Sequence, residues 1–189
     1  MGIADRKDRQ RAERRQRIVA AARLVAEREG WGAVTIRRLA EEIEHSQPVL
    51  YSHFDNREAI VAAVALAGFQ ELTAALQAAA LQATGRGEAV EAVALAYLAF
   101  ARQHAALYEA MFNLPTGLTF AQNETRPELK EAFAALATVV APATADADVA
   151  TETFWAALHG LAELERSGRI RPGARAERVA LLVGGMAGW

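Results

Sequence analysis

The chain has 189 residues, a formal net charge of −2 and 52% hydrophobic residues, and it contains no cysteine. This length allows one or two small domains with an ample core, and the lack of cysteine excludes disulfides, thiolate metal sites and a cysteine nucleophile. Alanine, which favours helix, supplies much of the hydrophobic content, and no stretch shows the sustained period-2 alternation of a half-buried strand. We therefore predict an all-α protein.

The distribution of apolar and charged residues indicates where the protein is found in the cell and where its positive charge lies. The longest apolar run, Val179 to Trp189, is too short to span a bilayer, and the N-terminus lacks the apolar core of a signal peptide. We expect a soluble, cytoplasmic protein with no membrane partner. Residues 1–17 carry 7 basic against 3 acidic side chains, whereas residues 61–189 carry 9 against 13. Positive charge therefore gathers near the N-terminus.

The first part of the chain reads as short helices that lead into a longer one. Residues 1 to about 9 are polar and expected to fray, and Gly30 is suited to the left-handed position that ends a helix. Apolar spacing and capping residues predict four helices, over residues 10–29, 35–43, 46–54 and 56–80. We predict that residues 1–68 form a helix-turn-helix DNA-binding domain.

The remaining residues, 69–189, are predicted to form a second helical domain. Its helices are expected over residues 88–104, 105–112, 128–141, 148–166 and 175–189, with a long loop over 113–123. The last helix is apolar nearly all round, so it must be buried, and in a terminal position this suggests a homodimer. The dimer-interface candidates are Leu161, Leu164, Val179, Leu182, Val183 and Met186.

The stretch from Thr35 to Arg57 has the pattern of two short helices and a tight turn, the geometry that lays a recognition helix into the major groove of DNA. Gln47 could bond adenine, Pro48 and Val49 could contact a thymine methyl, and Arg37 could reach guanine or a phosphate. The predicted phosphate contacts are Thr35, Tyr51, Ser52, His53 and Arg57. A solvated helical hairpin without a DNA role fits the same pattern.

A set of motifs between about Arg17 and Ala67 points to a known family. The motifs are Ile18 to Ala22, Gly30 with Thr35, Leu39-Ala40, Leu50-Tyr51-x-His53-Phe54 and Asn56-Arg57-Glu58-Ala59-Ile60. Together they resemble the N-terminal domain of the tetracycline-repressor-like (TetR-type) transcriptional regulators. The stretch Gln47 to His53 is similar to the recognition helix of tetracycline repressors, which implies base contacts for Arg37, Gln47, Pro48 and Val49. The chain departs from the family at Glu44-His45, where Gly then Val is usual.

The resemblance implies a homodimer through the last two helices, a double-stranded DNA operator and a small-molecule effector bound among the preceding helices. Trp155 to Gly160 resembles the Trp, His-Gly signature of one C-terminal subclass. The pocket candidates are Tyr97, Phe100, His104, Tyr108, Met111, Phe112, Phe133, Trp155 and His159, although each one singly is more often a core residue. His159 and Glu163 make a weak metal pair because no third ligand is suitably spaced. We predict no cofactor.

Two other classes of function fit parts of the sequence. An enzyme within a helical bundle would need a carboxylate or histidine constellation, such as Glu-x-x-His pairs on facing helices, and the predicted helices offer none. A membrane-surface protein could use Arg11, Arg14, Arg15 and Arg17 ahead of the apolar face of the first helix, but that face also fits a domain core. The sequence favours a ligand-responsive DNA-binding repressor that is not an enzyme.

Overall fold

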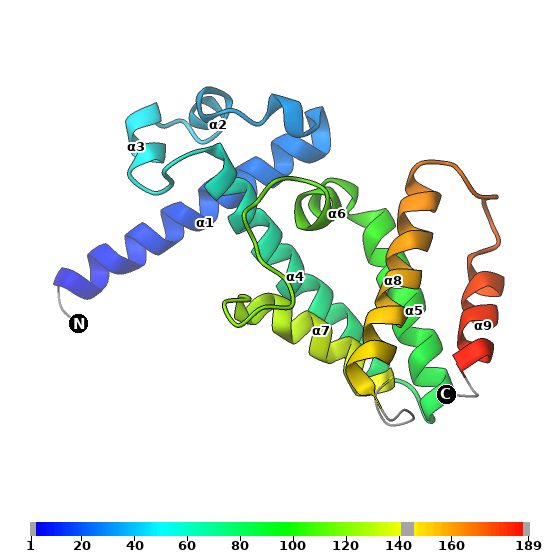
Figure 1. Ribbon diagram of the computed structural model, residues 1–189. Coiled ribbons are helices and arrows are strands. Elements are labelled where there is room, and N and C mark those ends of the chain that lie inside the picture. The colour runs from blue at the N-terminus through cyan, green and yellow to red at the C-terminus, as the bar shows by residue number, and fades with distance from the viewer. Residues whose placement is uncertain (1–2, 141–145, 187–189) are drawn as a thin grey trace. The chain divides into compact units, whose positions relative to one another are not determined.

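The computed structural model describes residues 3–140 and 146–186. Within these residues every regular element is helical, which confirms the all-α prediction (Figure 1). In chain order the elements are α1 (Ile3–Glu29), the 3₁₀ turn η1 (Trp31–Ala33), α2 (Ile36–Glu42), α3 (Gln47–Tyr51), α4 (Arg57–Leu81), α5 (Arg86–Gln103), α6 (Ala105–Phe112), α7 (Pro127–Val140), α8 (Ala147–Arg166) and α9 (Arg175–Met186).

The start of α1 is the clearest departure from the predicted bounds. We expected residues 1 to about 9 to fray, yet α1 begins at Ile3. Every side chain from Asp5 to Arg17 is exposed, so no core packing holds this part of the helix. The segment consists largely of Arg, Gln, Lys, Ala and Glu, which are strong helix formers. The prediction was wrong because it equated polarity with disorder.

The chain divides into two compact units. Unit 1 contains residues 1–68 and 106–119, and unit 2 contains residues 69–105 and 120–189. The sequence assigned α6 and the loop after it to the second domain, whereas residues 106–119, which are most of α6 and the first part of that loop, pack with the first unit. A side chain at Gly68 would bring its Cβ within 2.7 Å of the Met111 sulfur and 2.9 Å of Leu107 Cδ1. The close approach of α6 to α4 therefore needs glycine, a constraint that local periodicity does not reveal.

The core of unit 1 receives side chains from all of its helices. Its fully buried members include Ile18, Ala22, Val25, Val34, Leu39, Leu50, Ile60, Leu107 and Tyr108. Gly30 ends α1 with a φ of +81° and a ψ of 164°, so the predicted glycine with positive φ is present, but its ψ is extended and it does not adopt the left-handed helical conformation. The next residue, Trp31, is buried, and its indole N–H donates to the Ala106 carbonyl at 2.8 Å. This hydrogen bond ties η1 to α6 and satisfies the polar end of a buried indole.

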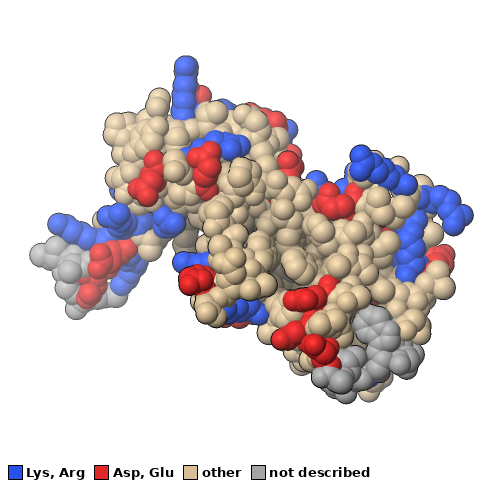
Figure 2. Space-filling view, viewed as in Figure 1, with Lys and Arg blue, Asp and Glu red and all other residues tan. Residues whose placement is uncertain are grey.

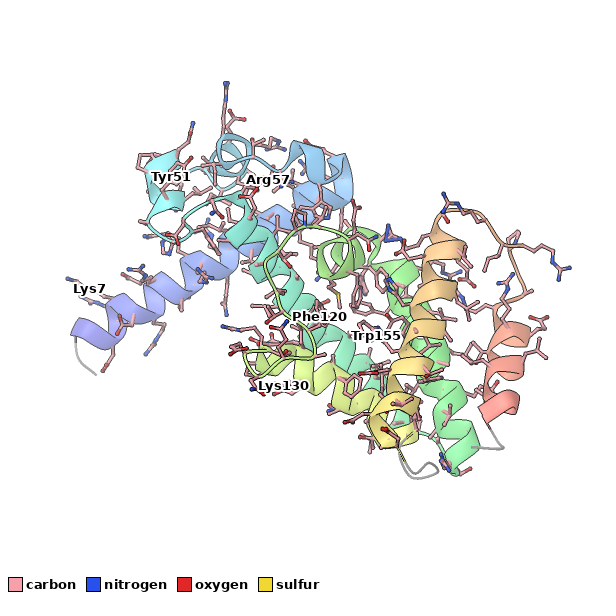
Figure 3. The ribbon with its side chains drawn as sticks, viewed as in Figure 1. Lys7, Tyr51, Arg57, Phe120, Lys130 and Trp155 are labelled. Atoms are coloured by element: carbon pink, nitrogen blue, oxygen red, sulfur yellow. The ribbon has the colours of Figure 1, made fainter. Side chains whose placement is uncertain are left out.

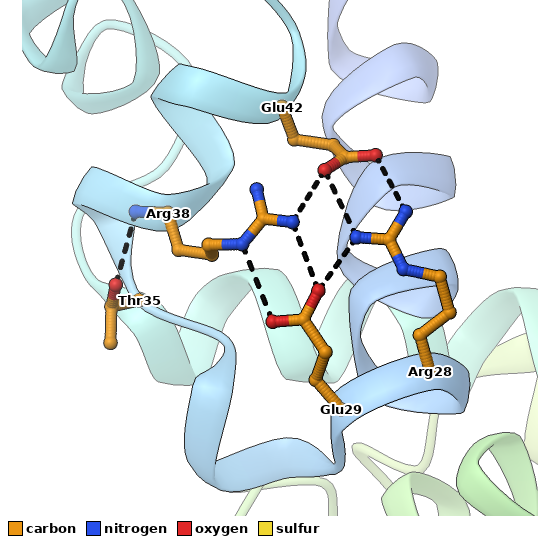
Figure 4. Close-up of polar contacts among 5 residues, drawn as sticks. All are labelled: Arg28, Glu29, Thr35, Arg38 and Glu42. Atoms are coloured by element: carbon orange, nitrogen blue, oxygen red, sulfur yellow. Dashed lines mark hydrogen bonds and ion pairs between the residues drawn. The ribbon is translucent and has the colours of Figure 1, made fainter.

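Two arginines and two glutamates join the end of α1 to α2 (Figure 4). Glu29 accepts from Arg28 at 2.6 Å and from Arg38 at 2.9 Å, and Glu42 pairs with the same arginines at 3.2 and 2.8 Å. The hydrogen bonds from Arg38 and Arg28 lower the pKa of Glu29 from 4.5 to about 2. Each carboxylate is shared by two cations, which makes this cluster a network rather than an isolated surface pair.

Unit 2 packs α5 against α7, α8 and α9. Its core includes Val93, Tyr97, Leu98, Phe154, Leu158 and Val179, each at most 1% exposed. The Arg86 guanidinium, at the start of α5, donates to the Val140 carbonyl at 3.0 Å and lies near the Val139 carbonyl at 3.4 Å. A cation at these last carbonyls of α7 satisfies groups that the helix leaves without partners.

One described helix, α4, is long and apolar enough to cross a membrane by length and composition alone. Its most apolar window has a mean hydropathy of 1.8, and 50% of that window is buried inside the protein. A core helix needs the same composition, so burial accounts for the apolar character of α4.

The shared carboxylate of Glu29 should make stability depend on acid pH. Because folding lowers its pKa, Glu29 contributes stability that is present above about pH 4.5 and is lost as the pH falls toward 2. In urea denaturation near about pH 6, the Glu29→Gln variant should be less stable than wild type. Its free energy of unfolding should also fall less than that of wild type as the pH is lowered from about 4.5 toward 2. Glu27→Gln is the matched control because Glu27 pairs with Arg23 of its own helix. Equal pH profiles for wild type and Glu29→Gln would contradict the prediction.

Candidate nucleic-acid interface

The turn between α2 and α3 is a complete helix-ending motif. The His45 N–H donates to the Ala40 carbonyl at 2.9 Å, and the Glu44 N–H donates to the Glu41 carbonyl at 3.3 Å. These are the two hydrogen bonds of a Schellman motif, whose residue after the C-cap adopts the left-handed conformation. Glu44 occupies that position with a φ of +55°. The sequence departure at Glu44-His45 therefore retains the tight turn but places a strained non-glycine residue in it.

Capping residues fix where the two short helices begin. Thr35 caps α2, as predicted, because its hydroxyl oxygen accepts from the Arg38 N–H at 3.1 Å. Ser46 is the N-cap residue of α3, but its side chain makes no capping hydrogen bond. Pro48 lies in the first turn of α3, where a missing N–H costs little. Leu50 beneath the helix is fully buried, and this single side chain sets which face of α3 is exposed.

Two arginines of α1 hold the C-terminal end of α3. The Arg11 guanidinium donates to the Ser52 carbonyl at 3.1 Å, and the Arg15 guanidinium donates to the His53 carbonyl at 2.8 Å. Arg15 also lies over the buried Phe54 ring, 4.0 Å from its centroid. A five-residue helix has too few internal hydrogen bonds to hold its own position, so these contacts help to orient it. The sequence analysis gave neither arginine this role.

The predicted base-contacting residues lie on α2 and α3 of unit 1, and Figure 3 labels Tyr51 at the end of α3. Gln47 and Pro48 are exposed and Val49 is half-buried, while Tyr51 is 54% exposed at the end of α3. Arg37 projects from α2 with 80% of its side chain exposed and forms an ion pair with Glu41 at 3.1 Å. A phosphate or guanine that binds Arg37 must compete with this carboxylate.

The predicted phosphate-contacting residues differ in whether their polar groups already have hydrogen-bond partners within the protein. The Thr35 hydroxyl is exposed, and the Ser52 hydroxyl already donates to the Val49 carbonyl at 2.7 Å. His53 is half-buried, and its Nδ1 has no hydrogen-bond partner among the described residues. Burial, followed by the nearby charges of Arg11, Arg14 and Arg15, lowers its pKa, so His53 would meet DNA as a neutral ring.

Arg57 has a structural partner set that the sequence did not reveal. Its guanidinium donates to the Val34 and Trp31 carbonyls, both at 2.7 Å, and the side chain is half-buried. These bonds tie the start of α4 to the segment between α1 and α2. The guanidinium is therefore committed to the main chain, and we leave Arg57 out of the contacts proposed below.

The predicted pocket residues are divided between the two units. Tyr108, Met111 and Phe112 belong to unit 1, whereas Tyr97, Phe100, His104, Phe133, Trp155 and His159 belong to unit 2. A cavity of about 630 Å³ lies in unit 2 among α5, α8, the loop after α8 and α9, and none of the nine candidates lines it. The prediction selected large aromatic residues, and several of these fill the core instead.

Part of the predicted set does form an aromatic cluster in unit 2. The Trp155 indole N–H donates to the Tyr97 hydroxyl at 3.1 Å, and the His159 ring lies 6.4 Å from the Trp155 ring. Phe120 stacks on Trp155 with ring centroids 6.2 Å apart and meets Phe69 edge-on at 5.9 Å. Burial lowers the pKa of His159. The sequence analysis missed Phe120 because it lies in a loop with no periodic pattern.

The dimer-interface candidates differ in accessibility. Leu164 is 39% exposed, and Leu161, Leu182 and Val183 are half-buried. Val179 is fully buried against its own chain, so it has no surface to offer a partner. The side chain of Met186 lies outside the described residues. Leu181 was not among the candidates, yet it is 78% exposed.

A helix-turn-helix with an exposed second helix, joined to a separate helical unit, is the architecture of a DNA-binding transcriptional regulator. Residues 18–64 match the model of bacterial regulatory proteins of the tetR family, and residues 90–184 match the model of the tetracyclin repressor-like C-terminal domain. The chain belongs to the tetracycline-repressor family, whose members regulate transcription and are not enzymes.

Individual relatives agree with this assignment. An uncharacterized HTH-type transcriptional regulator of Mycobacterium tuberculosis is 31% identical over 157 residues, or 82% of this chain and 71% of the relative. A solved protein of unknown function from Rhodococcus sp. RHA1 matches with a TM-score of 0.74 and 26% identity, over 91% of this chain and 92% of its own. A TetR/AcrR-family regulator from Thermobifida fusca YX-ER1 shares the fold, with a TM-score of 0.68 and 19% identity over 92% and 98%.

The left-handed residue in the turn gives a test of local strain. Replacing Glu44 with glycine removes the Cβ that disfavours its φ of +55°, and should raise the free energy of unfolding by about 0.5 to 1 kcal/mol. Glu44→Ala removes the same carboxylate but keeps a Cβ, so it should bring no such gain. Chemical denaturation of the two variants measures the difference. Equal stabilities would show that the turn is not strained at this residue.

Proposed function

We propose that this regulator is a ligand-responsive repressor that binds a palindromic operator as a homodimer. The observation that carries the proposal is the exposed face of α3, where Gln47, Pro48 and Tyr51 are accessible while Leu50 is buried beneath them. Side chains on such a face can reach base edges when the helix enters the major groove. Two copies related by a twofold axis would read the two halves of a palindrome.

The proposed DNA contacts follow from the groups that remain accessible. Gln47 is assigned to adenine, Pro48 and Val49 to a thymine methyl, and Arg37 to guanine or a phosphate. Thr35, Tyr51 and Ser52 are exposed and are assigned to phosphates, with His53 beside them. The contact of Ser52 requires that its hydroxyl leave the Val49 carbonyl, to which it donates in the free protein. The contact of Arg37 requires that its ion pair with Glu41 open or be shared.

The proposed dimer uses α8 and α9 of unit 2. Leu164 and Leu181 are large apolar side chains exposed in the single chain, and burying them against a partner is favourable. Gly184 and Gly185 are also exposed, and among the described residues a Cβ built on either meets nothing within 4 Å beyond its chain neighbours and the nearby backbone of α9. Glycines on this part of α9 would let a partner helix approach closely.

The proposed effector is a small, largely apolar molecule that binds at the aromatic cluster of unit 2. Trp155 is half-buried and Phe120 is 38% exposed, so the cluster reaches the surface of the unit. A flat apolar molecule could stack between such rings, and the Tyr97 hydroxyl and His159 ring supply polar groups. Binding there would favour a dimer in which the spacing of the two recognition helices no longer matches successive major grooves.

The repressor proposal is tested by asking which DNA the protein selects. Full-length protein should retain palindromic fragments from its own promoter region in a pull-down, and fluorescence anisotropy should show affinity that falls with rising salt. Equal, weak binding to every fragment would overturn the proposal of a palindromic operator.

Sequence discrimination should depend on Gln47. Gln47→Ala should cost roughly 1 to 3 kcal/mol of discrimination at one adenine position in each half-site. Competition binding with duplexes that vary at each position measures this loss. Gln77→Ala is a matched control because Gln77 is an exposed glutamine of α4. An equal loss of affinity for all duplexes would make Gln47 a positioning residue.

A further inference from the structure

The N-terminal part of α1 is a helix without a core. All side chains from Asp5 to Arg17 are exposed, and the first buried residue of α1 after this segment is Ile18. Seven of these residues are Lys or Arg and three are Asp or Glu, although the whole chain has a net charge of −2. Figures 1 and 2 show this part of α1 projecting from unit 1 with basic side chains along it. A polar helix in this position suggests a polar partner.

The basic side chains of this segment are ordered along the helix. Lys7, Arg11, Arg14 and Arg15 follow the spacing that places them on one face, and Ile18, Ala22 and Val25 continue the same face into the core. The core-facing stripe of α1 thus becomes a basic stripe where the helix leaves the core. By the same helical period, Asp8 falls at the edge of this face beside Arg15, whereas Asp5 and Glu13 share the opposite face with Arg6, Arg9 and Arg17.

Two side chains of this basic stripe contact the end of α3. Arg11 and Arg15 donate to the Ser52 and His53 carbonyls, directly after the recognition helix. Lys7 lies one turn further toward the N-terminus than Arg11, or about 6 Å along the axis at 1.5 Å per residue. Lys7 and Arg14 make no hydrogen bond or ion pair with described residues. Lys7 on the N-terminal side of Arg11, and Arg14 between Arg11 and Arg15, are therefore cations next to the arginines that hold α3.

We infer that residues 5–17 of α1 form a second DNA-binding element, in which Lys7 and Arg14 contact backbone phosphates beside the groove that α3 enters. This inference rests on the proposed operator binding and adds a contact surface to it. Phosphate is the complementary charge, and a duplex whose groove holds α3 presents phosphates along its edges. These contacts would raise affinity for all sequences and leave base discrimination to α3.

An anionic membrane surface offers the same charge, but the composition of the segment argues against it. Helices that lie in a membrane interface need an apolar face to bury. Between Asp5 and Arg17 the only apolar residue is Ala12. The segment could approach a lipid headgroup only through its charges, whereas the neighbouring recognition helix already directs it to DNA.

The test compares two double variants of the full chain that lose the same charges. Lys7→Gln with Arg14→Gln removes the two proposed phosphate contacts. Lys130→Gln with Arg169→Gln removes one exposed lysine and one exposed arginine from unit 2. Circular dichroism should give wild-type helicity and melting for both, because all four side chains are exposed. Anisotropy is measured across a salt series, with the palindromic duplex that wild type selects and with a random duplex of equal length.

We expect the Lys7/Arg14 variant to bind both duplexes at least roughly tenfold more weakly at about 0.1 M salt, with their affinity ratio unchanged. The slope of log K against log salt should decrease in magnitude by about 1.8 per protomer, 0.9 for each lost contact. The Lys130/Arg169 variant should match wild type.

Two results would overturn the inference. One is a Lys7/Arg14 variant with the same affinities and salt slope as the Lys130/Arg169 variant. The other is unchanged DNA binding together with lost binding to vesicles of phosphatidylserine and phosphatidylcholine, which would assign the stripe to lipid. A wild-type protein that selects no operator would instead overturn the proposed function, so the two failures are distinguishable.

Discussion

The position of α3 is the constraint on which the proposed DNA contacts depend. This helix has only five residues, and so short a helix is not stable alone. Its N-terminal side is set by the Schellman turn at Glu44, its underside by buried Leu50, and its C-terminal side by Arg11 and Arg15. Most of the contacts that orient α3 are therefore made with residues outside the helix.

The basic side chains of unit 1 differ in what they bond. Arg28 and Arg38 share two carboxylates, and Arg57 donates to main-chain carbonyls, so these three hold unit 1 together. Lys7 and Arg14 have no such partners and remain available to an anion. The number of basic residues alone says little about nucleic-acid binding, because a paired cation is already partly neutralised by its neighbours.

Unit 2 combines a filled core with accessible apolar surfaces. Tyr97 is fully buried, yet it accepts a hydrogen bond from the half-buried Trp155, which Phe120 covers. The aromatic cluster therefore extends from the buried Tyr97 through Trp155 to Phe120 at the surface of unit 2. Along α8 and α9, Leu164 and Leu181 leave apolar area in water that a partner chain could cover. In the proposed repressor, the aromatic cluster would bind the effector and the exposed leucines would link two copies.

The sequence by itself determined the helices and the exposed face of α3, because periodicity and capping are local properties. Gly30 and the caps at Thr35 and Asn56 lie where the sequence predicted them. Only the tertiary structure decided which side chains are committed to internal partners. Arg57 and Val179 fit their predicted roles by spacing, yet contacts with residues distant in sequence bury or occupy them. Phe120 joins the aromatic cluster from a loop, and no local pattern specifies such long-range contacts.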